Sequence, residues 1–317
     1  MESKLILGKY KLLEEIGKGG MGRVYKAEDI RLDRIVAIKE LVISDLLEEN
    51  ERLEIVERFR REAQSAAGLN HPNIVTIYDV LEENQRHYIA MEYASGKTLK
   101  NKMDENYKFT LDELLDIFIQ IAAGLEHAHS KGIIHRDIKP DNIKIVDDNV
   151  VKIMDFGIAS MERKKDSITQ RGSLMGTLGY ISPEQLYNSN KVDSRADIFS
   201  FGAMLYEFFT KKLPFEGENI AEVIMNIMTL TPILPSKYNI NMHPKIENLI
   251  LKCLDKDPEK RYQKFKEISS ELMILKFSEN SGELKLSDAV YDTGLLGEVN
   301  QLRLTFQEHS SYTTPPN

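Results

Sequence analysis

The chain has 317 residues, of which 42% are hydrophobic and 29% are charged. This balance is ordinary for a soluble globular protein and excludes a disordered chain. The formal net charge of -8 disfavours a nucleic-acid partner, although it leaves room for a local basic patch. The single cysteine, Cys253, excludes an intramolecular disulfide, and no apolar stretch is long enough for a signal peptide or a membrane segment. We therefore expect a soluble, cytoplasmic protein.

The first predicted strand, residues 10–16, leads into a glycine-rich stretch with the sequence Gly17-Lys18-Gly19-Gly20-Met21-Gly22-Arg23-Val24. Its glycines permit a tight turn that brings backbone N–H groups close to phosphates. A dinucleotide-binding loop would require a helix next, but residues 24–27 are strand-like. The stretch therefore predicts a strand–loop–strand flap, with a hairpin that binds nothing as the alternative.

A lysine and a glutamate far apart in the sequence are predicted to pair. Lys39 ends the strand-like motif Val-Ala-Ile-Lys, and residues 50–68 have a helical pattern in which Glu62 shares the apolar stripe of Phe59. A carboxylate in an apolar stripe is costly without a partner, and Lys39 is the obvious one. An ordinary structural ion pair is the alternative.

Two short loops carry most of the polar chemistry. The first is His135-Arg136-Asp137-Ile138-Lys139-Pro140-Asp141-Asn142, and the second is Asp155-Phe156-Gly157. Pro140 and the extended apolar runs at residues 143–146 and 150–154 exclude a long helix here. Asp137, Asn142 and Asp155 are therefore expected to converge at strand ends, where hard oxygen ligands suit Mg²⁺.

In this order and at this spacing, the motifs resemble those of the protein kinase family, and their style is similar to that of bacterial, eukaryotic-like serine/threonine kinases. The resemblance covers about residues 10–276. It implies an α+β, two-lobed fold with a β-rich N-lobe (10–94) and a mainly helical C-lobe (95–276), with ATP between them. Residues 277–317 are rich in Ser, Gly and Glu and are expected to form a flexible C-terminal tail.

The resemblance also implies an activity, the transfer of the ATP γ-phosphoryl group to protein serine or threonine hydroxyls. In such a reaction Asp137 would orient the hydroxyl and accept its proton, and Lys139 would neutralise the moving charge. Lys39, paired with Glu62, would fix the α- and β-phosphates. Asn142 and Asp155 would hold Mg²⁺.

The same resemblance implies which residues line the nucleotide site. They are Ile16, Gly17, Lys18, Gly19, Gly20, Gly22, Val24, Ala37, Lys39, Met91, Glu92, Ala94, Asn142, Lys144 and Asp155. Met91 would be the gatekeeper, and backbone groups of Glu92 and Ala94 would bond the adenine edge. Lys144 departs from the family, which usually has an apolar residue here. Its stem could cover the ring while the ammonium reaches water.

A polar segment, residues 158–174, and the following Met175 to Gln185 resemble the activation segment of bacterial serine/threonine kinases. We expect autophosphorylation there, with Thr169 the leading site and Ser173 or Ser167 next. The phosphate would pair with Arg136, beside the catalytic loop.

Two structural roles complete the resemblance. Glu184 would pair with Arg261, and Asp197 would hold the backbone of the catalytic loop.

Two other functions remain open. A pseudokinase scaffold would bind partners without transferring phosphate, but no catalytic residue is missing. A small-molecule phosphotransferase of related fold is disfavoured by the long activation segment. The expected partners are protein substrates, this chain itself in autophosphorylation, and a second copy in a homodimer.

Overall fold

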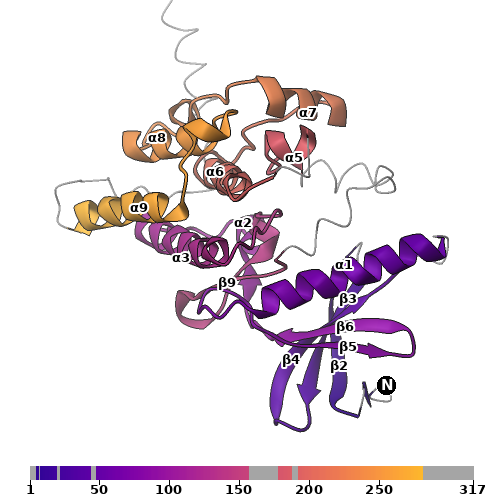
Figure 1. Ribbon diagram of the computed structural model, residues 1–317. Helices are drawn as coiled ribbons and strands as arrows, with labels where there is room; N and C mark the ends of the chain where they lie inside the picture. Colours follow the sequence, from indigo (N-terminus) through magenta and orange to yellow (C-terminus); the bar gives the residue numbers. More distant parts are fainter. Residues whose placement is uncertain are drawn as a thin grey trace, which may run out of the picture.

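The computed structural model describes residues 5–6, 8–19, 22–43, 48–156, 178–187 and 192–280, with only the backbone described for residues 62, 148, 279 and 280. The described chain has two lobes, a twisted antiparallel sheet with one long helix and a larger helical lobe (Figure 1). This is the two-lobed α+β architecture expected from the sequence.

The N-lobe is built on a six-stranded antiparallel sheet in the order β1-β2-β3-β4-β6-β5. Its strands are β1 (Leu5–Ile6), β2 (Tyr10–Gly19), β3 (Gly22–Asp29), β4 (Arg34–Leu41), β5 (Ile77–Glu83) and β6 (Arg86–Glu92). The helix α1 (Glu49–Ala67) packs against β5 and buries Phe59 and Ala63 beside Leu41 and Ile89. Its long axis lies along one side of the sheet (Figure 1).

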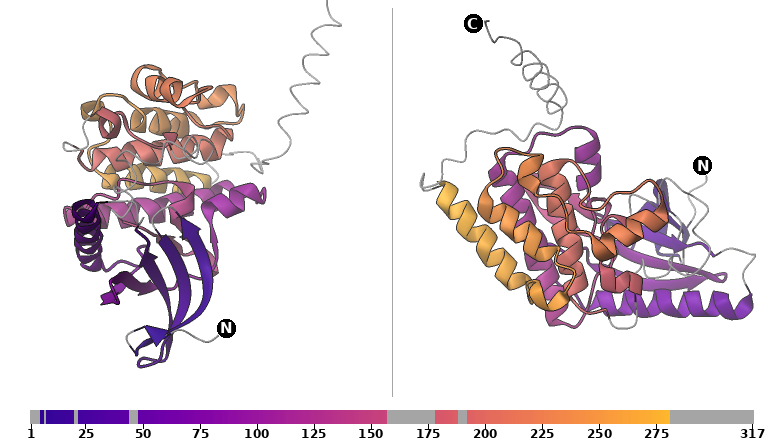
Figure 2. Two further views of the ribbon diagram at one scale, coloured as in Figure 1. Left: turned by 90° about the vertical axis from the view of Figure 1, so that its right-hand side faces the viewer. Right: turned by 90° about the horizontal axis from the view of Figure 1, so that it is seen from above.

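The C-lobe consists of helices around a small ribbon of three short strands. The helices are α2 (Leu99–Asp104), α3 (Leu111–Ser130), α5 (Pro183–Tyr187), α6 (Arg195–Thr210), α7 (Ile220–Thr229), α8 (Pro244–Cys253) and α9 (Phe265–Asn280). The ribbon strands are β7 (Lys97–Thr98), β8 (Ile143–Ile145) and β9 (Val151–Ile153), and the 3₁₀ turns are η1 (Pro140–Asn142), η2 (Asp147–Asn149), η6 (Pro235–Lys237) and η7 (Pro258–Lys260). Figure 2 shows α9 at the outer edge of this lobe, where it packs against α3.

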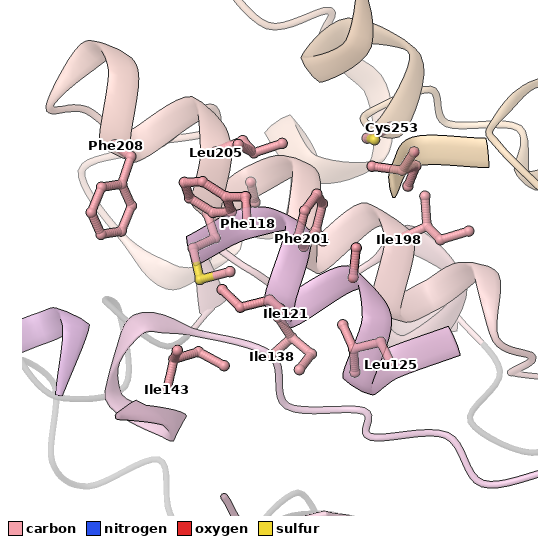
Figure 3. Close-up of a cluster of buried hydrophobic side chains, with 14 of the residues drawn as sticks. Phe118, Ile121, Leu125, Ile138, Ile143, Ile198, Phe201, Leu205, Phe208 and Cys253 are labelled. Carbon is pink, nitrogen blue, oxygen red and sulfur yellow. The ribbon is translucent and has the colours of Figure 1, made fainter. Parts of the chain in front are cut away.

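The core of the C-lobe lies between α3 and α6 (Figure 3). The Phe118 ring meets the Phe201 ring edge to face with 5.5 Å between centroids. Two isoleucines of the polar loop join this core, because Ile138 and Ile143 are fully buried. Burial of each such side chain stabilises the fold by about 1.5–3 kcal/mol. The loop between them is therefore fixed to the core at both ends.

Local features mark the boundaries of several elements. A capping box formed by Thr110 and Glu113 starts α3. The strand β5 begins only at Ile77, and Ile74 before it forms an isolated parallel bridge with Ile153. The last helix continues to Asn280, beyond the expected domain end at residue 276. Among the described residues, no helix combines the length and apolar character of a membrane span.

Candidate active site

A buried aspartate from α6 holds the backbone of the loop that begins at His135. One oxygen of Asp197 accepts a hydrogen bond from the His135 N–H at 2.8 Å, and the other accepts one from the Arg136 N–H at 2.7 Å. The His129 ring of α3 lies 2.7 Å from the same carboxylate. Burial would raise the pKa of Asp197, but the hydrogen bond and charge of His129, with a smaller contribution from His135, lower it below its ordinary value. The expected role of Asp197 is confirmed.

This anchoring holds Arg136 in an unfavourable backbone conformation. Its φ is 67°, in the left-handed region that costs a non-glycine residue about 1–3 kcal/mol. Gln185 donates a hydrogen bond to the Arg136 carbonyl at 2.8 Å, so contacts on both sides stabilise the strained residue.

Three polar side chains of this loop meet at one point. The Asn142 amide donates to the Asp137 side-chain oxygen at 2.9 Å and to the Asp137 carbonyl at 2.7 Å. The Lys139 ammonium lies 3.1 Å from the same carboxylate oxygen. Ile138, between them, is buried in the core (Figure 3). The structure therefore brings Asp137, Lys139 and Asn142 together, with the carboxylate held in one orientation.

A second group of opposite charges joins the two lobes. Lys39 of β4 is almost buried, and its ammonium lies 2.6 Å from the Asp155 carboxylate. Burial would raise the pKa of Asp155, but the charge and hydrogen bond of Lys39 lower it below its ordinary value. The backbone of α1 places Glu62 on this helix, but its side chain lies outside the described part, so its pairing with Lys39 stays a prediction.

The two predicted metal ligands, Asn142 and Asp155, are neighbours in space. The Met154 N–H donates to the Asn142 carbonyl at 2.9 Å, which places Asp155 directly after this contact. The amide nitrogen of Asn142 faces Asp137, so the amide oxygen is the atom that it offers as a ligand. An ionised carboxylate and an amide oxygen are hard donors of the kind that Mg²⁺ prefers, and the residues present therefore fit this ion. Within the described ranges, no cluster of three or more His, Cys, Asp or Glu side chains could hold a metal.

Residues 17–19 and 22–24 pair as antiparallel strands, as the predicted strand–loop–strand flap requires, and do not start a helix. Strand pairing places Gly17 opposite Val24 and Gly19 opposite Gly22, and Val24 opposite Lys39. The side chains of Ile16 and Lys18 are exposed on this hairpin, and Gly20 lies outside the described residues. The dinucleotide-binding alternative is therefore wrong.

The end of β6 and the segment that follows it are each held from the other lobe by a lysine. Ala37 pairs with Met91 across β4 and β6, which places both at the start of this segment. Lys152 of β9 forms an ion pair with the Glu92 carboxylate at 2.6 Å. Lys144 of β8 donates a hydrogen bond to the Ala94 carbonyl at 2.7 Å.

The contact of Lys144 corrects the expectation from the sequence. Lys144 is half-buried, and its ammonium donates a hydrogen bond to the Ala94 carbonyl, a contact that we did not expect. Burial lowers the pKa of this ammonium below its ordinary value. The stem of the side chain is thus drawn toward the segment at residues 92–94.

Comparison with known proteins now identifies this arrangement. A model of the protein kinase domain matches residues 10–273. The chain belongs to the protein kinase family. The match starts at the residue where we expected the kinase domain to begin, and it ends within α9.

The similar curated proteins are bacterial kinases. A probable serine/threonine-protein kinase of Clostridium acetobutylicum is 41% identical over 276 residues, which are 87% of this chain and 41% of that protein. The serine/threonine-protein kinase PrkC of Bacillus subtilis is 41% identical over 269 residues, 85% of this chain and 41% of its own. PknB of Mycobacterium tuberculosis is 40% identical over 270 residues, which are 84% of this chain and 42% of that protein. The kinase chain thus spans about two fifths of the length of these relatives.

The expected ion pair of the kinase C-lobe is present. Arg261 is almost fully buried, and its guanidinium binds both oxygens of Glu184 at 2.6 and 2.9 Å. It also donates to the carbonyls of Asp255 and Arg195. The predicted phosphorylation sites Thr169, Ser173 and Ser167 lie outside the described residues.

Sequence reasoning missed the two lysine contacts to the segment after β6. A usable signal was present, because Lys144 lies between Ile143 and Ile145, and Lys152 between Val151 and Ile153. This alternation indicates that both lysines project from the open face of a half-buried ribbon. It does not indicate what they contact, since both partners are about fifty to sixty positions away.

Proposed function

We propose that this chain is a serine/threonine protein kinase that transfers the γ-phosphoryl group of ATP to protein hydroxyls. The observation that carries the proposal is the position of the Asp137 carboxylate, fixed by the Asn142 amide and beside the Lys139 ammonium. A carboxylate held in this way can orient a hydroxyl and accept its proton as the hydroxyl attacks.

The other residues act by position and charge. Lys139 stabilises the negative charge of the phosphoryl group in flight, and Lys39 binds the phosphates that remain on the nucleotide. Asn142 and Asp155 would hold Mg²⁺, which when bound neutralises charge on the phosphates. The hairpin around Gly17 to Gly22 covers the phosphates and excludes water. Such positioning and preorganised electrostatics supply most of the catalysis in phosphoryl transfer.

Backbone groups after β6 give the nucleotide site its base specificity. The Glu92 carbonyl accepts from the amino group of adenine, and the Ala94 N–H donates to the neighbouring ring nitrogen. Met91 forms the gatekeeper at the back of the site, and Ala37 and Val24 cover the ring from the N-lobe. The support for this assignment is the pairing of Ala37 with Met91 and of Val24 with Lys39.

The kinase is activated by autophosphorylation, with Thr169 as the leading site and Ser173 or Ser167 next. Arg136 supports this proposal, because its backbone is fixed beside the catalytic loop by Asp197 and Gln185. A phosphate on the activation segment would form a bidentate pair with the Arg136 guanidinium and order the segment for substrate.

The activity is tested with purified protein, labelled ATP and Mg²⁺, with and without a generic protein acceptor, and phosphosites are mapped by mass spectrometry. We expect label in serine or threonine, and a loss of about a hundredfold or more in Asp137→Asn. Asp147→Asn, the same change at an exposed position on η2, is the matched control. Nucleotide binding without any transfer by the wild type would favour the pseudokinase scaffold instead.

The activation proposal has its own test. Wild type, Thr169→Ala and Arg136→Ala are treated with phosphatase, assayed, and assayed again after incubation with ATP. We expect ATP to stimulate only the wild type. Full activity of the dephosphorylated wild type, or equal stimulation of Thr169→Ala, would exclude a switch at Thr169.

A further inference from the structure

Two lysines face each other on the ribbon beneath the segment at residues 92–94. Lys144 of β8 and Lys152 of β9 are direct cross-strand partners in an antiparallel pair. Side chains at such positions project from the same face of a sheet, and like charges there repel each other. Each lysine therefore needs a partner of its own.

The two lysines bind different kinds of partner. Lys152 binds the carboxylate of Glu92, which also accepts from the Thr76 N–H at 3.1 Å. Among the residues that the structure describes, Lys144 has no carboxylate partner. Its ammonium donates to the backbone carbonyl of Ala94 at 2.7 Å and lies 5.9 Å from the centroid of the Tyr93 ring. Lys152 thus binds the segment at residues 92–94 through the Glu92 side chain, whereas Lys144 binds it through the backbone carbonyl of Ala94.

This acceptor has a definite place in the recognition of a base, if the proposed function is correct. Along its hydrogen-bonding edge adenine presents the N6 donor, the N1 acceptor and then the C2–H, which forms no ordinary hydrogen bond. In the proposed function the Glu92 carbonyl accepts from N6 and the Ala94 N–H donates to N1, and the Ala94 carbonyl is the next polar backbone group of the same residue. With the base bound in this way, the Ala94 carbonyl would face the C2 position of the purine.

We propose that Lys144 is a specificity-determining residue for the C2 position of the purine. Its ammonium occupies the Ala94 carbonyl, which would otherwise accept a hydrogen bond from a donor group at C2. A hydrogen bond from an ammonium is stronger than one between neutral groups, so the carbonyl is a poorer acceptor for a second donor. An amino group at C2 would also direct its positive hydrogens toward the ammonium. Purines with hydrogen at C2 are thereby favoured over 2-aminopurines.

The test compares the binding of ATP with that of 2-amino-ATP, the triphosphate of 2,6-diaminopurine riboside, which differs only by an amino group at C2. Dissociation constants are measured for wild type, Lys144→Met, Lys144→Gln and Lys152→Met. Lys144→Met releases the carbonyl, and we expect its preference to shift toward 2-amino-ATP by about threefold to tenfold, the value of one hydrogen bond. Lys144→Gln retains a neutral donor, and its preference between ATP and 2-amino-ATP should lie between that of the wild type and that of Lys144→Met.

Lys152→Met is the matched control, since it removes the neighbouring lysine but leaves the Ala94 carbonyl engaged. We expect it to change the affinities for both nucleotides by the same factor. An unchanged ratio in both Lys144 variants, or an equal shift of the ratio in Lys152→Met, would overturn the proposal. If Lys144→Met does not fold, the comparison of wild type with Lys144→Gln decides. Failure of the wild type to bind either nucleotide would instead contradict the proposed function.

Discussion

The ammonium of Lys39 lies 2.6 Å from the carboxylate of Asp155, although the two residues are 116 positions apart in the chain. The contact joins β4 of the N-lobe to the loop that follows β9 in the C-lobe. It keeps Asp155 ionised, because the lysine charge and hydrogen bond outweigh the effect of burial on the pKa. The carboxylate is therefore available as a hard ligand at the junction of the lobes.

From this contact we predict that Asp155→Ala loses phosphoryl transfer by about a hundredfold or more while the domain stays folded. The change removes a ligand for Mg²⁺ and leaves the Lys39 ammonium without this partner. Turnover and thermal unfolding are measured together, with Asp147→Ala, at an exposed carboxylate, as the control. Near-normal turnover in Asp155→Ala would contradict the assignment of this residue to the metal.

Asp197 gives a prediction with a defined pH dependence. Its folded pKa lies below its ordinary value of 3.8, so its stabilising effect is complete above that pH and is lost as the pH falls toward the folded pKa. We predict that Asp197→Asn lowers the free energy of unfolding by about 2 kcal/mol or more at neutral pH. The difference in the free energy of unfolding between Asp197→Asn and the wild type should become smaller as the pH is lowered from about 7 to about 3, as measured by denaturant titrations. A constant difference over this range would show that the carboxylate charge is not what holds the loop.

The buried pair of Arg261 and Glu184 predicts a large loss of stability on truncation. Arg261→Ala leaves Glu184 without its bidentate partner and removes donors from buried carbonyls, which should cost about 3–5 kcal/mol. Lys260→Ala, one position earlier but exposed, should change stability by less than about 0.5 kcal/mol. Chemical denaturation measures both, and similar values for the two variants would exclude a special role for the buried pair.

Two glycines of the hairpin should respond differently to the same substitution. A Cβ at Gly22, whose φ is 150°, would lie 1.8 Å from the Glu40 carbonyl oxygen, whereas a Cβ at Gly19 would meet nothing within 4 Å. Gly22→Ala must therefore shift β3 away from β4, with an expected cost of about 1–3 kcal/mol. Gly19→Ala should unfold at nearly the wild-type denaturant concentration. Equal stability of the two variants would mean that the strands separate there without cost.

The domain boundary can be tested by truncation. Deletion of residues 281–317 should leave the melting temperature nearly unchanged, because Phe265, Ile268, Leu272 and Leu275 of α9 keep their contacts with the core. Deletion from residue 265 onward removes these side chains and should prevent stable folding. A large drop in melting temperature for the shorter deletion would show that the tail packs on the domain.

Much of the site was predictable because its signals are local. Pro140, the apolar runs that follow it and the spacing of Asp137 and Asn142 specify a loop that leads into short strands, and these interactions act within a few residues. The helical stripe at residues 50–68 likewise predicted α1 to within one residue at each end. Neighbouring residues dominate such choices, so composition and periodicity are sufficient to predict them.

The partners of Lys144, and the contact between Lys39 and Asp155, were decided by the tertiary structure alone. Alternation in β8 indicates which face Lys144 occupies, but its bond to the Ala94 carbonyl depends on how the ribbon packs beneath the segment after β6. A side chain with a flexible stem and three donors can satisfy many acceptors, and its sequence neighbours do not choose among them. The same holds for Lys39 and Asp155, since the distance between β4 and the loop after β9 is set by the packing of whole lobes.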